Sequence, residues 1–155
     1  MNFTRQVNRA LDDDHRAALD LLARVEQTFG RGGGRDAALA ATFGRQVELD
    51  LSRHFGFEER ELFPRITEAG AGDLATLLLE EHETIRRVAA ELLPLARAAA
   101  SLDDAGWAAL RRSALEMVER LRAHIDKETA ALLPAIDDAL DEDTDRELAF
   151  AYAAG

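Results

Sequence analysis

The sequence predicts an all-α protein folded as an antiparallel up-down four-helix bundle. Apolar residues recur at helical spacing, in steps of three, four or seven, along four long stretches of the chain. The connections between these stretches are short and rich in Gly, Pro or Asp. Apolar residues make up 47% of the chain and aromatic residues only 6%, so the apolar content is mostly Leu and Ala, which favour helices. Long helices joined by short loops are typical of such bundles.

The first helix is expected from about Thr4 to Phe29. Its apolar stripe consists of Val7, Leu11, Ala18, Leu22, Val25 and Phe29. His15 fills the gap in this stripe and is therefore expected to face the core. The glycine-rich segment Gly30–Arg35 should end the helix as a flexible connection, because it lacks the Gly-Lys-Ser/Thr ending of a phosphate-binding loop.

The second helix is expected to begin after Asp36, a favourable N-cap residue, and to end near Pro64. Its stripe consists of Leu39, Phe43, Val47, Leu51, His54, Glu58 and Leu62. A histidine and a glutamate thus continue a run of core positions. Gly44 and Gly56 each weaken the helix, and their presence is explained if they permit close packing. Residues Thr67–Gly72 are expected to form the next loop.

The third helix is predicted to follow Asp73 as its cap, and Pro94 should end or kink it, although residues 95–100 can still be helical. Its stripe consists of Leu74, Leu78, His82, Ile85, Ala89 and Leu92. His82 again occupies a core position. The bundle is assigned to residues 1–140.

The fourth helix is predicted to be capped by Asp103 or Asp104 and to close near Pro134. Its stripe consists of Leu110, Ala114, Met117, Leu121, His124, Glu128 and Leu132. Residues 141–155 form an acidic and then Ala-rich tail, which is expected to hold one short helix or to fray.

Composition narrows the class of protein. The 155 residues are sufficient for one domain with a substantial core. The absence of cysteine excludes disulfides, thiolate metal sites and a cysteine nucleophile. A formal net charge of -11 argues against sequence-independent nucleic-acid binding, which needs a basic surface. No apolar run approaches a signal peptide or a membrane span, so we expect a cytoplasmic protein without nucleic-acid or membrane partners.

One motif occurs twice, at an offset of 70 residues. Both copies have the form His-x-x-x-Glu-x-x-x-Leu-(Phe/Leu)-Pro-x-Ile, and they start at His54 and His124. Residues four apart lie on the same face of a helix, so each copy points an imidazole and a carboxylate in one direction. The other two histidines, His15 and His82, are 67 residues apart, and each follows two acidic residues. The chain therefore has an internal repeat, which predicts a pseudo-twofold axis through the core.

All four histidines of the chain fall on core stripes, one on each predicted helix. Burial of four imidazoles and two carboxylates is costly unless the groups satisfy one another or bind metal. The candidate metal ligands are His15, His54, Glu58, His82, His124 and Glu128. Six ligands suit two ions, with both carboxylates bridging and two imidazoles on each ion. The repeat pairs His15 with His54 and His82 with His124, and these donors suit iron, manganese or zinc.

Other polar residues near the motifs are given lesser roles. Asp50 and Glu61 lie one turn from motif residues and either support a ligand or lie on the helix surface, and the surface interpretation is favoured. Glu59 and Glu81 adjoin candidate ligands but are expected to point about 100° away. Tyr152 is expected to be structural.

The sequence resembles the hemerythrin-like, or HHE cation-binding, domains over about residues 4–140. The resemblance is carried by Asp14-His15, His54 with Glu58, Glu81-His82, His124 with Glu128, and the two Leu-(Phe/Leu)-Pro endings. It implies a hemerythrin-like four-helix bundle that holds two iron ions in an oxo- or hydroxo-bridged centre, with Glu58 and Glu128 as bridges and the four histidines as terminal ligands. Ferritin-like bundles use Glu-x-x-His, which this chain lacks.

The resemblance also implies the kind of function. Members of the family carry or sense dioxygen, respond to nitric oxide, decompose peroxide or sense iron. Oxygen carriers have a fifth histidine one turn from the third-helix ligand, whereas Leu78 and Arg86 stand one turn from His82 here. This departure argues against simple oxygen carriage and predicts a more symmetric, more open centre.

We therefore expect a non-haem di-iron protein that binds or reduces dioxygen, nitric oxide or peroxide. The alternatives are non-enzymatic modules, one that senses iron or oxygen and one that delivers iron. No separate nucleophile or acid–base residue is identifiable, so enzymatic turnover stays open, and the sequence identifies no redox or output partner.

Overall fold

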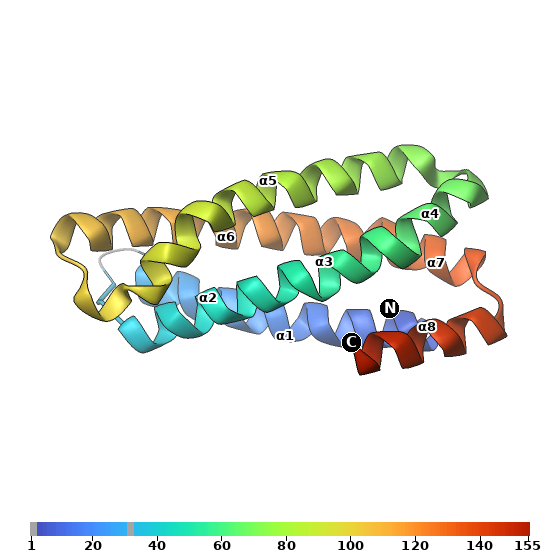
Figure 1. The fold of residues 1–155 in the computed structure, drawn as a ribbon, viewed down its shortest axis with the longest axis horizontal. Helices are drawn as coiled ribbons and strands as arrows, with labels where there is room; N and C mark the ends of the chain where they lie inside the picture. Colours follow the sequence, from blue (N-terminus) through green and yellow to red (C-terminus); the bar gives the residue numbers. More distant parts are fainter. Residues whose placement is uncertain (1–2, 31–32) are drawn as a thin grey trace.

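The computed structural model describes residues 3–30 and 33–155, and all regular secondary structure within these ranges is helical. Four long arms lie side by side as an antiparallel bundle, which confirms the predicted fold class (Figure 1). The helices are α1 (Gln6–Phe29), α2 (Ala37–Ser52), α3 (His54–Phe57), α4 (Phe63–Ile66), α5 (Gly72–Arg97), α6 (Asp104–Lys127), α7 (Leu133–Ala139) and α8 (Glu142–Ala154). Shorter segments are the π-helical turns η1 (Glu58–Leu62), η2 (Thr67–Ala71) and η4 (Glu128–Leu132) and the 3₁₀ turn η3 (Ala99–Ser101).

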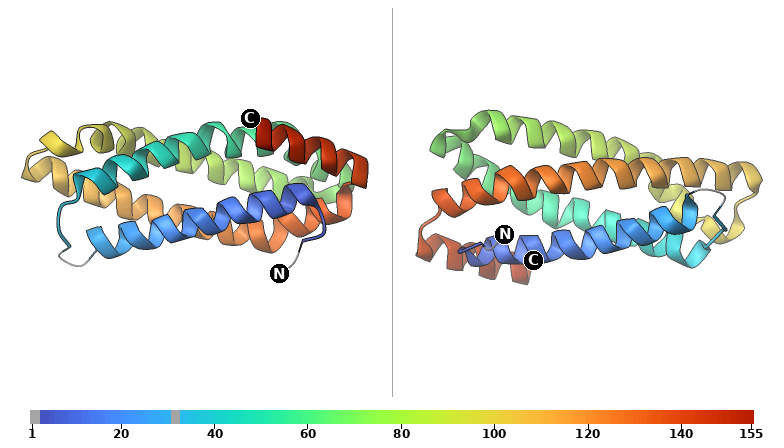
Figure 2. Two further views of the ribbon diagram at one scale, coloured as in Figure 1. Left: turned by 90° about the horizontal axis from the view of Figure 1, so that it is seen from below. Right: turned by 180° about the vertical axis from the view of Figure 1, so that it is seen from behind.

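The second and fourth arms of the bundle are each built from several helical segments. The second arm comprises α2, α3, η1 and α4, and the fourth comprises α6, η4 and α7. Helix α1 packs along α6, whereas α5 packs against both α2 and α6. The views in Figure 2 show that each arm runs antiparallel to the arms that follow and precede it in the chain. Each repeat therefore supplies one hairpin of the bundle.

Several predicted helix ends are confirmed and others are wrong. The side chain of Asp36 accepts a hydrogen bond from the Leu39 N–H at 2.9 Å, and Asp103 accepts one from the Gly106 N–H at 2.8 Å. Asp73, by contrast, lies in the first turn of α5, with Ala71 at the cap position. Its charge still favours the positive end of the helix dipole. Pro94 does not end α5, which continues to Arg97, in line with the expectation that residues beyond it can still be helical.

The two π-helical turns η1 and η4 start at the two motif glutamates. In each turn a backbone N–H bonds the carbonyl five residues back, from Phe63 to Glu58 and from Leu133 to Glu128. A proline follows directly in both arms, and its ring would clash with the carbonyl four residues back in a regular helix. The wider turn relieves this clash. The Leu-(Phe/Leu)-Pro ending of the motif therefore explains why the helix widens beside the glutamate.

The core consists of two apolar clusters with a polar layer between them. One cluster includes Leu22, Val47 and Ile85, and the other includes Leu11 and Leu78. The predicted stripes run through both clusters. The histidines of the four arms interrupt the stripes at one level of the bundle, so the motif residues lie between apolar layers that exclude water from above and below.

The tail is a helix, which is one of the two expectations for it. Asp141 caps α8 by accepting a hydrogen bond from the Thr144 N–H at 2.7 Å. Helix α8 packs along α1. Its buried Asp145 accepts hydrogen bonds from the backbone N–H groups of Gln6 and Val7 at 2.9 and 3.0 Å. This contact explains why α1 starts at Gln6 rather than Thr4, because a carboxylate distant in sequence caps its first turn.

The predicted break between the second and third arms is found, but it is narrower than the predicted loop. Residues Thr67–Ala71 belong to the helical turn η2, and the chain reverses at Gly70, whose φ of 100° favours glycine. The predicted Gly30–Arg35 connection follows α1, but its residues 31–32 lie outside the described part of the chain. Among the described helices, none combines the length and apolarity needed to span a membrane.

Of the two glycines expected to permit close packing, Gly44 does so, whereas Gly56 faces only the end of a flexible side chain. A Cβ atom at Gly44 would lie 2.7 Å from the Cβ of Ala96 in α5. We predict that Gly44→Ala lowers the free energy of unfolding by about 1–3 kcal/mol, because the backbones of α2 and α5 must separate. Denaturant unfolding followed by circular dichroism measures the change.

Gly56→Ala is the matched control for this experiment. The nearest atom to a Cβ there is the mobile guanidinium end of Arg60, at 2.9 Å. The gain in helix propensity should leave stability unchanged or raise it by up to about 1 kcal/mol. Equal losses in both variants would contradict the packing explanation.

Candidate metal centre

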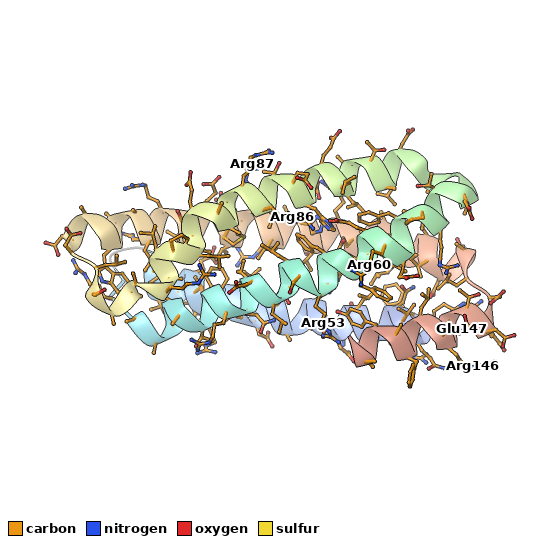
Figure 3. The ribbon with its side chains drawn as sticks, viewed as in Figure 1. Arg53, Arg60, Arg86, Arg87, Arg146 and Glu147 are labelled. Carbon is orange, nitrogen blue, oxygen red and sulfur yellow. The ribbon has the colours of Figure 1, made fainter. Side chains whose placement is uncertain are left out.

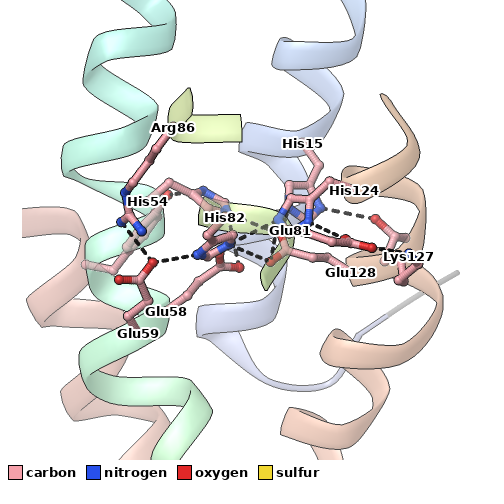
Figure 4. A network of polar contacts seen from close by, with 12 residues as sticks. His15, His54, Glu58, Glu59, Glu81, His82, Arg86, His124, Lys127 and Glu128 are labelled. Atoms are coloured by element: carbon pink, nitrogen blue, oxygen red, sulfur yellow. Dashed lines mark hydrogen bonds and ion pairs between the residues drawn. The ribbon is translucent and has the colours of Figure 1, made fainter. Parts of the chain in front are cut away.

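All six residues proposed from the sequence come together in the polar layer of the bundle (Figure 4). They arise from α1, the α3–η1 junction, α5, and the α6–η4 junction. Each of these residues is at most 6% exposed. We call this set the six-residue cluster: His15, His54, Glu58, His82, His124 and Glu128.

The cluster divides into two overlapping groups of four residues, which share Glu58 and Glu128. Half-site 1 adds His15 and His54 to the two glutamates, and half-site 2 adds His82 and His124. Within each group, one ligand atom from every residue lies within 4.8 Å of the others. This grouping is the same as the pairing inferred from the repeat.

The interatomic distances fit cations held between these side chains. In half-site 1, Nε2 of His54 lies 3.3 Å from Oε2 of Glu58, and Nε2 of His15 lies 3.0 Å from Oε1 of Glu128. In half-site 2 the distances from Nε2 are 3.3 Å for His82 to Oε1 of Glu58 and 3.2 Å for His124 to Oε2 of Glu128. Metal–nitrogen and metal–oxygen bonds of about 2.0–2.2 Å place neighbouring ligand atoms about 3.0–3.5 Å apart. The observed separations are in this range.

Two imidazole nitrogens face each other across half-site 2. Nε2 of His82 and Nε2 of His124 are only 3.1 Å apart. Two lone pairs at this distance repel each other, unless a proton lies between them or both are directed to a common cation. The two nitrogens of half-site 2 are therefore placed to donate their lone pairs to one metal cation.

Several inward atoms of the cluster lack hydrogen-bond partners within the described part of the chain. They are Nε2 of His54, both carboxylate oxygens of Glu58, and Oε2 of Glu128. An unsatisfied buried carboxylate is costly, and coordination of a cation removes this cost. Glu58 carries the strongest form of the argument, because both of its oxygens are buried without a hydrogen bond, and each faces a histidine Nε2 at 3.3 Å.

Without metal, the electrostatics of the cluster favour protonated histidines and an ionised Glu128. Burial opposes protonation of His54, but the carboxylates of Glu58 and Glu128 outweigh it and raise the pKa of His54 well above its ordinary value. The same competition raises the pKa of His82 to about 9 and raises that of His124. Burial likewise opposes ionisation of Glu128, but the surrounding histidines keep its pKa well below the ordinary range. In the absence of a cation, protonated imidazoles therefore balance the negative charge of the buried carboxylates.

Each histidine directs Nε2 inward and hydrogen-bonds an outer partner through Nδ1. In half-site 2, Nδ1–H of His82 donates to Glu59 at 2.7 Å, and Nδ1–H of His124 donates to Glu81 at 2.8 Å (Figure 4). Arg86 pairs with Glu59 at 2.8 Å, and Lys127 pairs with Glu81. Such partners fix the imidazole tautomer and orientation.

The outer partners in half-site 1 are hydroxyl groups. Nδ1 of His15 lies 3.1 Å from the hydroxyl of Thr129, and Nδ1 of His54 lies 3.0 Å from the hydroxyl of Tyr152. The Tyr152 hydroxyl donates in turn to Asp14. Burial and the neighbouring Asp14 carboxylate raise the pKa of Tyr152, so the phenol remains protonated and keeps donating.

The expectations for these outer residues are incomplete. Glu59 and Glu81 do point away from the core axis, but this direction leads to the histidine of the neighbouring helix rather than to solvent. Tyr152 is not only structural, since it contacts His54. A signal for the acids was present in the repeat. One acid follows Glu58, and acids precede both His15 and His82.

The surface interpretation is confirmed for Glu61, which pairs with Arg65 at 3.8 Å. Asp50 differs from this expectation, because its half-buried carboxylate accepts a hydrogen bond from Gln46 at 2.9 Å and lines a cavity beside His54. Burial raises the pKa of Asp50, and the nearby His54 opposes this rise.

Aromatic rings hold half-site 2 from the side. Phe55 stacks on His82 with ring centroids 3.7 Å apart and an interplanar angle of 3°. Phe63 packs against the same imidazole at 5.3 Å. The orientation of His82 is therefore set by packing as well as by hydrogen bonds.

The arginine that pairs with Glu59 lies on the inner side of α5. In Figure 3, Arg86 lies between α5 and the second arm, whereas Arg87 projects outward from α5.

The fold and this layer define a helical-bundle protein with a buried His/Glu site that could hold metal. The family model of the hemerythrin HHE cation binding domain matches residues 6–136. The chain therefore belongs to the hemerythrin HHE cation-binding family, which confirms the resemblance seen in the sequence. No curated protein matches the chain significantly.

The raised pKa values predict how the metal-free protein responds to pH. The pKa of His82 is about 9 in the folded protein and about 6.5 when unfolded. Its contribution to stability is therefore present below about pH 6.5 and is lost as the pH rises through about 9. We expect the free energy of unfolding to fall by on the order of 3 kcal/mol across this window.

Denaturant titrations of chelator-treated protein between pH 6 and pH 10 measure this loss. Protein reloaded with metal is the control and should show a smaller loss, because the cation replaces the protons. A metal-free protein that is equally stable across the window would contradict the assignment.

Proposed function

We propose that this chain is a non-haem di-iron protein that binds or reduces dioxygen, nitric oxide or peroxide at its four-His/two-Glu centre. The observation that carries the proposal is the sharing of Glu58 and Glu128 by both half-sites. Half-site 1 would hold one iron through His15 and His54, and half-site 2 would hold the other through His82 and His124. Bound iron would supply open coordination positions and electrons for the small ligand.

A small cavity beside half-site 1 supports a ligand of diatomic size. Its volume is about 30 Å³, and its wall includes His15, His54 and Glu128 together with His124 of half-site 2. The apolar part of the wall consists of Ala18, Phe55, Leu121 and Ile125. A cavity of this size admits a water molecule, a diatomic or peroxide, but not an organic substrate.

Asp50 is a candidate proton donor in the same cavity. Its carboxyl lines the wall next to Asp14, and burial raises its pKa. The side chain therefore holds a proton to higher pH than an exposed aspartate does. Reduction of dioxygen or peroxide consumes protons, so a carboxylic acid in the ligand cavity supports reduction over binding alone.

The surroundings of His82 support the argument against simple oxygen carriage. Leu78 is fully buried in an apolar cluster, and Arg86 pairs with Glu59. Neither position offers an imidazole to half-site 2. The two half-sites would therefore have matching sets of direct ligands, and their differences would lie in the outer partners.

A sensing function is the second candidate, and one contact favours it. Tyr152 of α8 hydrogen-bonds His54, so a change at half-site 1 would reach the C-terminal helix directly. Arg53 lies at the same junction, where it donates to the backbone carbonyl of Tyr152 at 2.8 Å (Figure 3). Proteolysis of α8 that is the same with and without iron would count against this function.

Metal content tests the centre. We expect about two irons per chain after anaerobic reconstitution, with near-ultraviolet bands from an oxo bridge in the oxidised protein. Glu58→Ala or Glu128→Ala should lose the bridged pair, because each change removes a carboxylate from both half-sites.

Glu61→Ala is the control for these variants. Glu61 lies on the same π-helical turn as Glu58 but pairs with Arg65 at the surface, so iron content should be unchanged. Glu59→Ala is not a neutral control, because Glu59 contacts His82. Normal iron content in the Glu58 and Glu128 variants would contradict the proposed centre.

Ligand exposure separates binding from reduction. We expect the reduced protein to be oxidised by dioxygen or peroxide without a long-lived oxygen adduct, and stopped-flow absorbance measures this reaction. Asp50→Asn should slow oxidation by about tenfold or more, if the carboxyl supplies a proton. A stable, reversible oxygen adduct would instead support carriage.

A further inference from the structure

The internal repeat extends to the outer partners of the histidines, but the partners are not equivalent. Glu59 and Thr129 are 70 residues apart, and each follows a bridging-position glutamate. Both contact Nδ1 of a histidine on a neighbouring helix, Glu59 on His82 and Thr129 on His15. The repeat therefore places a carboxylate behind one histidine and a hydroxyl behind its counterpart.

The second pair of partners differs in the same direction. Glu81 and Asp14 each precede a histidine of the cluster. Glu81 bonds His124 directly, at 2.8 Å. Asp14 reaches His54 only through the hydroxyl of Tyr152. Half-site 2 thus has two carboxylate partners, whereas half-site 1 has two hydroxyl partners.

This difference changes the strength of the inward-facing ligands. A hydrogen bond to a carboxylate is stronger than one to a neutral hydroxyl, and it pulls the Nδ1 proton away from the ring. The ring then holds more electron density on Nε2 and is a better metal ligand. Arg86 and Lys127 keep the two carboxylates of half-site 2 in place.

We propose that half-site 2 binds its metal ion more tightly than half-site 1 and fills first. Half-site 1 is the exchangeable position, and both of its histidines line the small cavity that would admit the ligand, whereas His124 is the one histidine of half-site 2 that does so. This inference rests on the proposed two-metal centre. It assigns the difference between the ions to Glu59, Glu81, Thr129 and Tyr152, none of which belongs to the six-residue cluster.

A Co²⁺ titration of the full-length metal-free protein tests the loading order. Visible absorbance and calorimetry should resolve two steps, with the first affinity at least about tenfold above the second. Two steps of equal affinity would overturn the inference while leaving the two-metal centre intact. Failure to bind Co²⁺ at all would overturn both.

Two variants assign the steps to the half-sites. Glu81→Gln should lower the affinity of the first step by about 10–100-fold and leave the second nearly unchanged, because it removes the carboxylate behind His124. Tyr152→Phe should lower the second step only, because it removes the hydroxyl behind His54 and keeps the ring. The opposite assignment in both variants would overturn the proposal.

A third variant adds the missing carboxylate, so that a folding defect cannot imitate the expected result. Thr129 borders a surface hollow of about 370 Å³ that also contains Arg16, and this hollow has room for a longer side chain. Thr129→Glu reproduces Glu59 in half-site 1 and should raise the affinity of the second step by about tenfold.

Ala130→Glu is the matched control, since it adds the same charge at an exposed neighbouring position. Both steps should stay within about twofold of the original protein. A second step that is no tighter in Thr129→Glu, or equally tighter in both variants, would overturn the role assigned to the carboxylate.

Discussion

The bundle depends on the burial of two carboxylates in an otherwise apolar core. Glu58 and Glu128 are almost completely inaccessible to solvent, and apolar clusters lie on both sides of them. A carboxylate in such a place is tolerated only with positive charge beside it. Four imidazoles supply this charge as protonated rings, or they share with the carboxylates the binding of cations. The other features of the layer position these rings.

The requirement for compensation explains why each arm contributes one histidine. Each carboxylate oxygen needs partners from more than one direction, and a single helix can present a residue only every turn on its inner face. The repeat meets this need with His-x-x-x-Glu on the even-numbered arms and a lone histidine on the odd-numbered arms. The arrangement also explains the apolar clusters, which keep water from screening the charges.

Much of this layer was predictable from sequence periodicity. The steps of three, four and seven identify the inner face of each helix, and the six residues of the cluster lie on those faces. Helix ends with a local acid, such as Asp36 and Asp103, were also predictable. The start of α1 was not, because its cap is Asp145, which is supplied by a helix at the other end of the chain.

The outer partners show where periodicity stops being informative. A residue rotated by about 100° from the core stripe faces either solvent or the adjacent helix, and the helix pattern alone does not distinguish them. Glu59 and Glu81 lie on such faces and reach histidines of neighbouring arms. Tyr152 was harder still, because its contact with His54 depends on how the tail packs over α1.

The π-helical turns show that the repeat extends from the sequence to the local geometry of the helix. A π turn is an α-helical turn with one residue inserted, and such insertions recur at functional sites. Here the inserted residue follows a buried glutamate in both halves, before the same proline. The two halves of the repeat therefore share the widened turn as well as the motif, and any change that restored a regular helix in one half would make the two halves differ in backbone beside the glutamate.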